Sequence, residues 1–492
     1  MKKLLIICLL PLLILQSCEK RLDIQPSNVA PEELILSTVD GMDGGLNFVY
    51  QTYHNNAGRT FTLWNEALAD HLEIRNLSTM PTHLYFYNRD LNAIVSEMVS
   101  VTDSRKLSDI KLRELYVPIN ATSLILEACK RDQASGDYTF AYNKDRLMGE
   151  CYLMRALCHM QLVNFWAQPW GTTADNSHPG VVINYEPVID RESQVKPRAS
   201  LKEVYDFIIS DLKEAVRLVP DGYVAGQHSG VFAGRFYKDA ARAYLARVYW
   251  MQRDYTNAVS TINDIIGATP GNMTRHPLQA NLVALFTARG VEGTDEEVLA
   301  QTTSVTTVNS SLATWWNASA PESIFSTANP KGLATSQFVA DAKYSAADQR
   351  LALWFLRQSD GRLAPAKYNR ALHFNIPLIR SAEMVLDRAE INAMNNNLEA
   401  ALEDINLIRG RAQTELLSMP VAQQDLVDSI RTERIRELCF EGDRLPNLRR
   451  MQAPVGPGDR AGVTPIAWDS KDLVLKYSEE DMARNPKLVN NY

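Results

Sequence analysis

Two short stretches of the chain set tryptophan beside asparagine, a combination that suits carbohydrate recognition. They are Trp64-Asn65 and Trp315-Trp316-Asn317. Flat aromatic rings pack against the C–H faces of a sugar, while amide side chains offer hydrogen bonds to its hydroxyl groups. Neighbouring tryptophans point to different sides of a strand or a helix, so burying both Trp315 and Trp316 is awkward. We therefore treat these five residues as candidate ligand contacts.

Tyr85 and Tyr87 are weaker candidates of the same kind. They would lie on one side of a possible strand in "LYFYN". For every one of these aromatic residues the alternative stays open that the ring packs a loop onto the scaffold, and for Trp64 we prefer that alternative. The sequence thus proposes a ligand face without choosing among its rings.

Motifs for catalysis are missing from the chain. It contains no G-x-S-x-G, no H-E-x-x-H, no Walker loop and no paired C-x-x-C, and its eight histidines are scattered without metal-ligand spacing. The 58 acidic residues always offer candidate carboxylate pairs, so their presence is uninformative about glycoside hydrolysis. We expect no enzyme activity, no cofactor and no metal site.

The composition is that of a folded, acidic protein. Apolar residues make up 46% of the chain and charged residues 22%, and the formal net charge is −7. No cluster of lysine and arginine interleaved with aromatics is present, which argues against nucleic acid as the ligand.

The N-terminus has the features of an export signal. Lys2 and Lys3 precede an apolar run of 12 residues, Leu4–Leu15, which is shorter than the roughly 20 residues of a membrane-spanning helix. The sequence "LQSC" then resembles the lipobox of bacterial lipoproteins, although Gln16 is larger than the usual residue. The resemblance implies that Cys18 is lipidated, for instance with palmitate, and becomes the first mature residue; a plain secretory signal is the alternative. Removal of both lysines would change the charge from −7 to −9.

Four cysteines remain after Cys8 and Cys18: Cys129, Cys151, Cys158 and Cys439. Each lies among apolar residues, so we favour buried thiols. Cys151 and Cys158 on one helix would be about 10 Å apart, too far for a disulfide with each other. An oxidising compartment keeps other pairings open.

Helical hairpins recur along the chain. "KDAARAYLARVYWMQRDYTNAVSTINDIIGATP" resembles a tetratricopeptide (TPR) unit, with small residues where two helices cross and a proline after the second helix. "SAEMVLDRAEINAMNNNLEAALEDINLIRGRA" repeats its twelve-residue alanine spacing, with the tight turn at "NNN". A third copy combines "RLMGECYLMRALCHMQLVNFW" with "SLKEVYDFIISDLKEAVRLVP", interrupted by a Pro/Gly-rich insertion. Such hairpins would stack into a right-handed solenoid.

Two other regions look irregular. Residues 271–379 are rich in Thr, Ser, Asn and Pro, yet Trp354, Phe355 and other aromatics argue for packed loops rather than a disordered linker. Residues 41–90 form the second region. Long insertions emerge from one face of a solenoid, so we look for ligands there.

The segment "RTERIRELCFEGDRLPNLRRM" resembles the E-R-x-R-E-L-x-F-E-G-x-R-x-x-D-L-x-R signature of the SusD/RagB family, with Pro446-Asn447 departing from the pattern. "LDIQP", "AARAYLARVYW", "AEMVLDRAE" and "NPKLVNNY" add to the resemblance in the same order along the chain. From the residues alone we expect one structural helix, with i,i+3 pairs Glu433–Arg436 and Arg434–Glu437 and Gly442 as a left-handed C-cap.

The resemblance implies a mostly α fold, in which TPR-like hairpins form a right-handed solenoid scaffold with long loop-rich insertions. It implies nutrient capture at the cell surface: an outer-membrane lipoprotein that binds oligosaccharides, or peptides as in the RagB branch, over a SusC-type TonB-dependent transporter. A lipid-anchored glycoside hydrolase and a TPR adaptor without a small ligand are the rival hypotheses.

The chain divides into six expected regions. They are a signal peptide (1–17), a tether (18–35), an N-terminal region with TPR-like helices (36–270), a loop-rich insertion as candidate ligand face (271–379), C-terminal TPR-like helices with the signature helix (380–450), and a tail packed on the scaffold (451–492).

Overall fold

Helices dominate the computed structural model, as the sequence predicts. It describes residues 32–75, 81–96, 98–100, 103–223, 234–286, 296–302, 331–368 and 375–491. The predicted lipidation site Cys18 and the Trp315-Trp316-Asn317 stretch lie outside these residues. No helix in the described ranges is long and apolar enough to cross a membrane.

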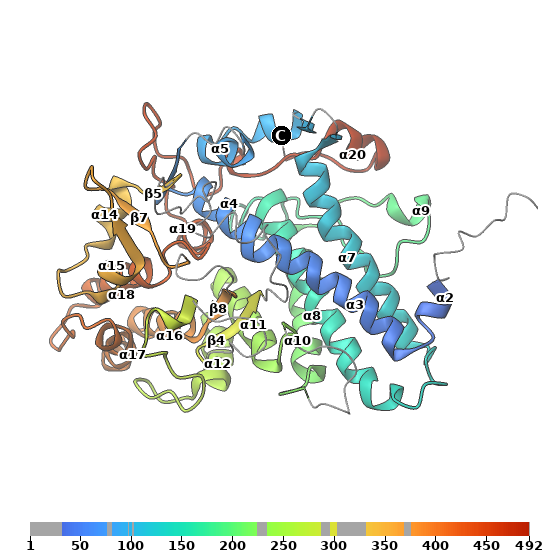
Figure 1. The fold of residues 1–492 in the computed structure, drawn as a ribbon, viewed down its shortest axis with the longest axis horizontal. Helices are drawn as coiled ribbons and strands as arrows, with labels where there is room; N and C mark the ends of the chain where they lie inside the picture. The colour runs from blue at the N-terminus through green and yellow to red at the C-terminus, as the bar shows by residue number, and fades with distance from the viewer. Residues whose placement is uncertain are drawn as a thin grey trace, which may run out of the picture.

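The helices extend from α2 at one end of the molecule to α17 and α18 at the other (Figure 1). Their bounds are α2 Glu32–Ile35, α3 Val39–Asn55, the π-helix η2 Asn56–Phe61, α4 Thr62–Leu68, α5 Pro81–Asn88, α6 Leu91–Ser96, α7 Leu107–Lys130, α8 Phe140–Trp166, α9 Arg191–Gln194, α10 Leu201–Leu218, α11 Lys238–Gln252, α12 Tyr255–Ile266, η3 Ala284–Phe286, α14 Ser336–Ala342, α15 Gln349–Trp354, α16 Ser381–Met394, α17 Leu398–Arg411, α18 Gln423–Glu437, α19 Arg444–Met451, η4 Lys471–Leu473 and α20 Glu479–Arg484.

Within the described ranges, eight short strands form two-stranded antiparallel pairs: β1 Leu72–Ile74 with β5 Gly332–Ala334, β2 Met98–Ser100 with β3 Asp103–Lys106, β4 Val298–Thr302 with β8 Ile376–Arg380, and β6 Phe355–Arg357 with β7 Leu363–Pro365. Two of these pairs join segments that are far apart in the chain. The strands β5 and β7 lie with α14 at one end of the molecule, beside α4, α5 and α19 (Figure 1).

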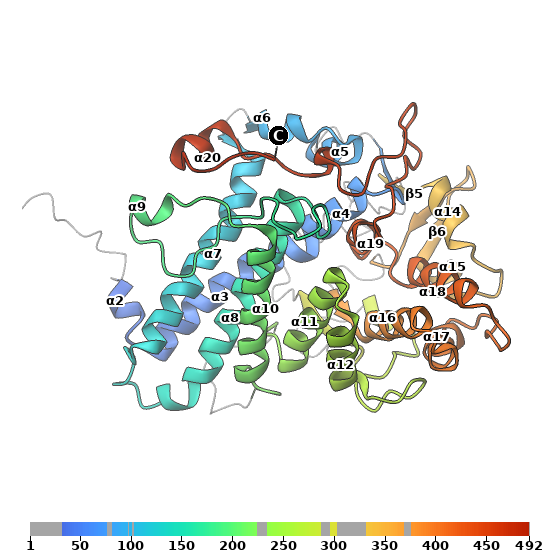
Figure 2. The same cartoon turned by 180° about the vertical axis from the view of Figure 1, so that it is seen from behind.

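The three predicted hairpins are present. They are α11–α12, α16–α17 and α8–α10, and they lie in succession across the molecule (Figure 2). The small residues Ala246, Ala258, Ala389 and Ala401 are fully buried, as expected where helices cross closely. Asn396 takes a positive φ in the "NNN" turn between α16 and α17.

Residues 41–90 are more regular than expected, because α3, η2, α4 and α5 account for most of them. Val39, Met42, Leu46 and Val49 follow a helical period and are buried. Gly41 is required by a close approach, since a Cβ at this position would meet the Ile35 carbonyl oxygen at 2.0 Å. The irregular assignment of this region was therefore wrong.

The signature segment is two helices rather than one. Helix α18 ends at Glu437, and a turn leads into α19 at Arg444. Phe440 and Gly442 both have a positive φ in that turn, which no continuous helix permits. A Cβ at Gly442 would also meet the Thr62 Cα at 3.1 Å, so glycine lets the turn approach α4.

One of the two ion pairs predicted in this segment is found. Arg436 and Glu433 are 3.0 Å apart. Arg434 turns away from Glu437 and binds Asp387 and Asp443 instead. The i,i+3 spacing could not predict these contacts of Arg434, because Asp387 and Asp443 lie outside α18.

The described parts of residues 271–379 contain short strands and the helices α14 and α15, where loops were expected. The aromatic anchors do pack, because Trp354, Phe355 and Phe338 are buried in the core. The tail after α19 runs back along the scaffold, where Leu475 N donates to the Phe165 carbonyl oxygen at 2.7 Å.

Cys129, Cys151, Cys158 and Cys439 are all buried free thiols. This confirms the prediction of buried side chains. Burial raises the pKa of Cys158 to about 12, so this thiol is inert at neutral pH.

Candidate ligand-binding face

Two of the three segments that carry predicted ligand contacts lie side by side at one end of the molecule. Helix α4 carries Trp64 and Asn65, α5 carries the two tyrosines, and both helices pack beside β1. Strand β1 pairs with β5, the first strand after residues 303–330. The described chain therefore resumes at β5, which pairs with β1 beside α4 and α5.

Trp64 lies in the core and has no exposed face for a ligand in this structure. Trp64 is 1% exposed. The ring stacks on Phe86 at a centroid distance of 3.9 Å and an interplanar angle of 17°, and Phe61 and Phe165 meet it edge-on. Trp64 therefore packs within the scaffold, as the preferred alternative predicted, and its ring holds α5 against α4.

Asn65 points inward, away from Trp64. It is buried, and its Oδ1 accepts a hydrogen bond from Asn164 Nδ2 at 2.9 Å. Adjacent residues on a helix diverge, so Trp64 and Asn65 do not form the joint sugar contact that their sequence order suggested.

Tyr85 and Tyr87 lie on a helix, so the strand expected for "LYFYN" was wrong. Residues two apart on a helix face different directions. Tyr85 is partly buried, whereas Tyr87 is buried beneath the Arg460 guanidinium, which is 4.3 Å from the ring centroid. Burial raises the pKa of Tyr87. The helix thus separates two rings that a strand would have placed together.

Four charged residues form a patch on the outer side of the small strands; we call Glu73, Arg75, Asp360 and Arg362 the charged patch. Arg362 bridges two carboxylates, with Nη1 3.0 Å from Glu73 Oε2 and Nη2 2.7 Å from Asp360 Oδ2. Arg75 Nε lies 3.5 Å from Glu73 Oε1. All four side chains are partly exposed, so their remaining donors and acceptors face solvent.

The charged patch adjoins Lys331, where the described chain resumes. The Arg75 backbone N donates to the carbonyl oxygen of Lys331 at 2.7 Å, and Lys331 is the first described residue after 303–330. Guanidinium and carboxylate groups make charge-assisted hydrogen bonds, which suit the hydroxyls of a sugar or the backbone of a peptide.

Inspection of the sequence missed the charged patch. Glu73 and Arg75 are an i,i+2 pair in "LEIR", and Asp360 and Arg362 form the same spacing in "SDGR". Such spacing puts both charges of a pair on one side of an extended chain, which is the local signal available. Nothing local indicates that the two pairs meet.

Asp70, His71 and Asp341 bring their ligand atoms within 4.8 Å of one another, the one such group found among the residues that the structure describes. Arg444 occupies this cluster, with Nε 2.7 Å from Asp70 Oδ1 and Nη2 3.2 Å from Asp341 Oδ2. Burial alone would raise the pKa of Asp70, but His71 and Arg444 together hold it below its usual range. The guanidinium supplies the cation here, so we interpret the cluster as an ion-pair junction between α14, α19 and α4.

The signature residues form a buried charge network. Arg350 contacts Asp348, Glu433 and Glu437, while Glu437 also binds Arg380 and Arg411. Burial alone would raise the pKa of Glu437, but Arg411, Arg380 and Arg350 lower it, so the carboxylate stays charged. These contacts join α15, α17, α18 and β8, which is the scaffold role expected for the segment.

Comparisons with known proteins agree with this architecture. A family profile described as "Starch-binding associating with outer membrane" matches residues 20–250, and the profile of the SusD family matches residues 364–492. SusD-like protein P38 of Formosa agariphila is 22% identical over 272 residues, which span 55% of this chain and 46% of that relative, less than half of its length.

Solved structures share the fold over almost the whole chain. A SusD superfamily protein from Bacteroides thetaiotaomicron has a TM-score of 0.74 at 17% identity and covers 92% of this chain and 100% of its own. A SusD-like carbohydrate-binding protein from Bacteroides vulgatus has a TM-score of 0.71 at 17% identity, with coverage of 93% and 98%. The two family matches together span most of the chain, in the order that the signature and the helical hairpins indicate, and this protein belongs to the SusD/RagB family.

Proposed function

We propose that this protein is a lipoprotein of the outer membrane, anchored through Cys18, that binds nutrient oligosaccharides at the cell surface and delivers them to a SusC-type TonB-dependent transporter. Family membership supports the sugar-binding role in general. The B. vulgatus neighbour is itself described as carbohydrate binding, which supports the same ligand class.

The observation that carries the proposal is the partly exposed charged patch, in which Arg362 bridges Glu73 and Asp360 and Arg75 lies beside Glu73. Its charged side chains suit the hydroxyl groups of a sugar. A glycan site also needs aromatic rings for stacking, and Trp315 and Trp316 are the rings that we propose. We place the ligand contacts at Trp315, Trp316 and Asn317 together with the charged patch.

We further propose that the protein binds its ligand without catalysis. Two pairs of neighbouring carboxylates are each bridged by an arginine. Arg362 bridges Glu73 and Asp360, and Arg444 bridges Asp70 and Asp341. A general acid needs a carboxyl group whose pKa is raised and which reaches the substrate, whereas these carboxylates are held in ion pairs.

The test is binding of a panel of oligosaccharides and peptides to the protein lacking residues 1–18, by calorimetry. We expect saturable binding of at least one glycan, weakened about tenfold by Arg75→Ala or Arg362→Ala, because each change removes charged donors. Arg217→Ala is the matched control, since Arg217 is an exposed arginine on α10 whose partner is Glu214.

If only peptides bind, the cargo is a peptide, as in the RagB branch, and not an oligosaccharide. Release of product from a glycan would instead establish a hydrolase. Unchanged affinity in both patch variants would remove the charged patch from the site.

A further inference from the structure

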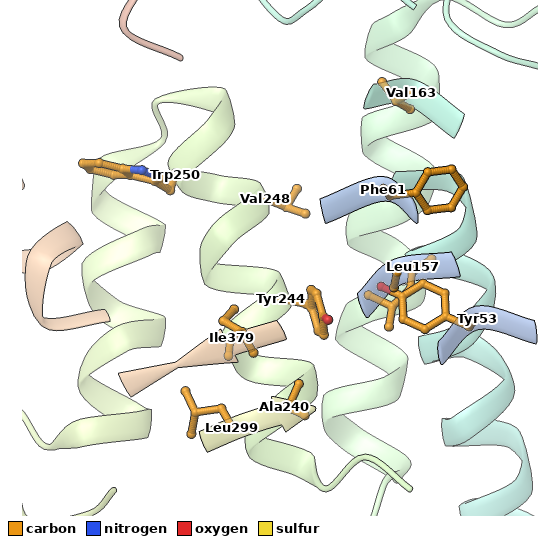
Figure 3. Packing of buried hydrophobic residues seen from close by; sticks show 14 of the residues in the cluster. Tyr53, Phe61, Leu157, Val163, Ala240, Tyr244, Val248, Trp250, Leu299 and Ile379 are labelled. Carbon is orange, nitrogen blue, oxygen red and sulfur yellow. The ribbon is translucent and has the colours of Figure 1, made fainter. Parts of the chain in front are cut away.

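Large apolar side chains gather on the outside of one end of the molecule. In the interior such side chains are buried in a packed core, as Tyr53 and Leu157 are (Figure 3). Near the start of the described chain, in contrast, Leu34 on α2 is 61% exposed, and Tyr138 and Tyr142 at the turn from α7 into α8 are 90% and 73% exposed. Together with the exposed Ile35, we call these residues the apolar tips: Leu34, Ile35, Tyr138 and Tyr142.

Contacts between α2 and the α7–α8 turn hold the apolar tips together. Gln133 Nε2 donates to the Glu33 carbonyl oxygen at 3.4 Å, and Val39 N donates to Asp137 Oδ2 at 3.0 Å. Glu33 and Asp137 each directly precede an apolar tip in the sequence. Helix α2 and the turn also lie at the same end of the molecule in both views (Figures 1 and 2). The apolar tips therefore belong to one face and are not scattered single residues.

Charged side chains beside the apolar tips pair with one another. Lys130 Nζ lies 3.3 Å from Glu127 Oε1, and Lys144 Nζ lies 2.6 Å from Asp132 Oδ1. Projecting apolar side chains between paired charges suit the interface of a lipid bilayer, where tyrosine places its ring among the acyl chains and its hydroxyl group among the headgroups. A protein partner would need a closely fitting pocket for each projecting side chain, whereas a fluid bilayer accommodates them without such pockets.

The sequence places this face next to the proposed lipid anchor. Thirteen residues, 19–31, separate Cys18 from the start of α2. A chain of that length reaches at most about 45 Å. Of the described elements, α2 follows the anchor most closely along the chain, so the face that it carries is the one tied nearest to the membrane.

We propose that the apolar tips are a docking face for the lipid bilayer, which takes them up at the level of the headgroups when the protein is anchored. The inference rests on the proposed anchoring through Cys18. The anchor supplies attachment, and the apolar tips supply orientation. Because the charged patch lies with β5 and β7 at the opposite end from α2, docking directs that patch away from the bilayer (Figure 1).

The test attaches the protein that begins at Cys18 to vesicles of phosphatidylcholine and phosphatidylethanolamine through a maleimide lipid. Attachment is selective, because the other four cysteines of this form are buried. Hydroxyl-radical footprinting with mass spectrometry then measures the oxidation of Tyr138 and Tyr142. We expect their oxidation to fall at least about threefold relative to protein that is blocked at Cys18 with N-ethylmaleimide and mixed with the same vesicles.

Met419 is the internal control for this footprint. It is 48% exposed between α17 and α18, at the opposite end from α2, and should be oxidised equally in both samples (Figure 1).

A pair of substitutions tests the apolar tips while both tyrosines remain as reporters. Leu34→Ser with Ile35→Ser removes apolar area from α2, and we expect it to reduce the protection of the tyrosines by about half or more. Val339→Ser with Leu416→Ser is the matched control, because these apolar residues are 50% and 55% exposed at the other end. All four positions are exposed, so both double variants should melt near the wild-type temperature.

Unchanged tyrosine oxidation on the attached protein would overturn the proposal, and so would equal protection of Met419, which would indicate general shielding by the vesicle. Protection that appears only in outer-membrane vesicles with other proteins would assign the face to a protein partner, and protection that grows with protein density would assign it to a second copy. Either result would overturn the bilayer as the occupant. Because Cys18 is attached chemically, these outcomes are independent of its lipidation in the cell, which fatty-acid labelling of Cys18→Ala tests.

Discussion

Glu66 shows how one buried side chain couples distant parts of the chain. It lies on α4 at 2% exposure, and its Oε1 accepts a hydrogen bond from Gly442 N, in the turn after α18, at 2.7 Å. Burial is the main cause that raises its pKa to about 8, with Asp443 acting in the same direction. The folded state therefore binds a proton here that the unfolded chain releases above about pH 4.5.

The contribution of Glu66 to stability is present below about pH 4.5 and is lost as the pH rises through about 8. We predict that Glu66→Gln flattens this dependence, because the amide keeps the acceptor for Gly442 and cannot ionise. At pH 8.5 the variant should be more stable than the wild type by up to about 4 kcal/mol, with little difference at pH 4. Urea unfolding at both pH values checks this, with exposed Glu186→Gln as control; equal curves for Glu66→Gln and wild type would contradict it.

Tryptophans in the core and at the ligand face should respond differently to the same substitution. Trp64→Ala empties a buried site and should cost about 3–5 kcal/mol of folding stability. If Trp315 or Trp316 contacts the cargo, its change to Ala should weaken binding by about 1–3 kcal/mol and leave the melting temperature nearly unchanged. Thermal melting and ligand titration on each single variant separate the two effects, and a large melting loss with unaltered affinity at both positions would remove the pair from the site.

At the scale of elements, prediction from sequence succeeded where structure is locally encoded. The alanine spacing of α11–α12 and α16–α17 reflects contacts within one hairpin, so a single stretch of sequence contains it. The β1–β5 pair depends on contacts between residues far apart in the chain, and "LEI" and "GLA" are too short to indicate a strand. Residues 41–55 were expected to be irregular, whereas the structure places them in α3, where Gly41 lies against the Ile35 backbone.

The candidate site was harder to predict for the same reason. Trp64 and Asn65 have a suitable composition for a sugar, but helical geometry directs one into the core and the other toward Asn164. The charged patch consists of ordinary surface residues until β1 and the β6–β7 hairpin meet. The sequence gives the type of each side chain, but it does not show in which direction that side chain points.

Helix α18 forms ion pairs with α15, α16, α17 and β8, and Arg350 on α15 is the structural residue at the centre of these contacts. It is fully buried on α15 between Asp348, Glu433 and Glu437. Removing it leaves carboxylates buried without their partner, so Arg350→Ala should lower the free energy of unfolding by about 3–5 kcal/mol. Exposed Arg217→Ala should change it by less than about 0.5 kcal/mol. A loss below 1 kcal/mol for Arg350→Ala in urea unfolding would contradict this structural role of Arg350.

At the scale of the whole molecule, the described chain begins with α2 at one end, while β5 and β7, which lie with the charged patch, are at the other (Figures 1 and 2). The proposed anchor Cys18 precedes α2 in the sequence. The proposed ligand face therefore lies at the opposite end from the start of the described chain.

Cys18→Ala should leave the protein folded but no longer held at the membrane, because stable anchoring needs the acyl chains. Metabolic labelling with a fatty acid followed by cell fractionation checks this. Cys8→Ala, within the expected signal peptide, is the control and should still be labelled. Label retained by Cys18→Ala would rule out this cysteine as the lipid site.

The central claim is capture without chemistry, and the most direct measurement titrates the protein lacking residues 1–18 with an oligosaccharide panel and then recovers the ligand for chromatography. The account predicts saturable binding of at least one oligosaccharide, weakened in Arg362→Ala but not in Arg217→Ala, with the ligand recovered at its original length. Shortened ligand, or no binding by any oligosaccharide of the panel, would contradict it.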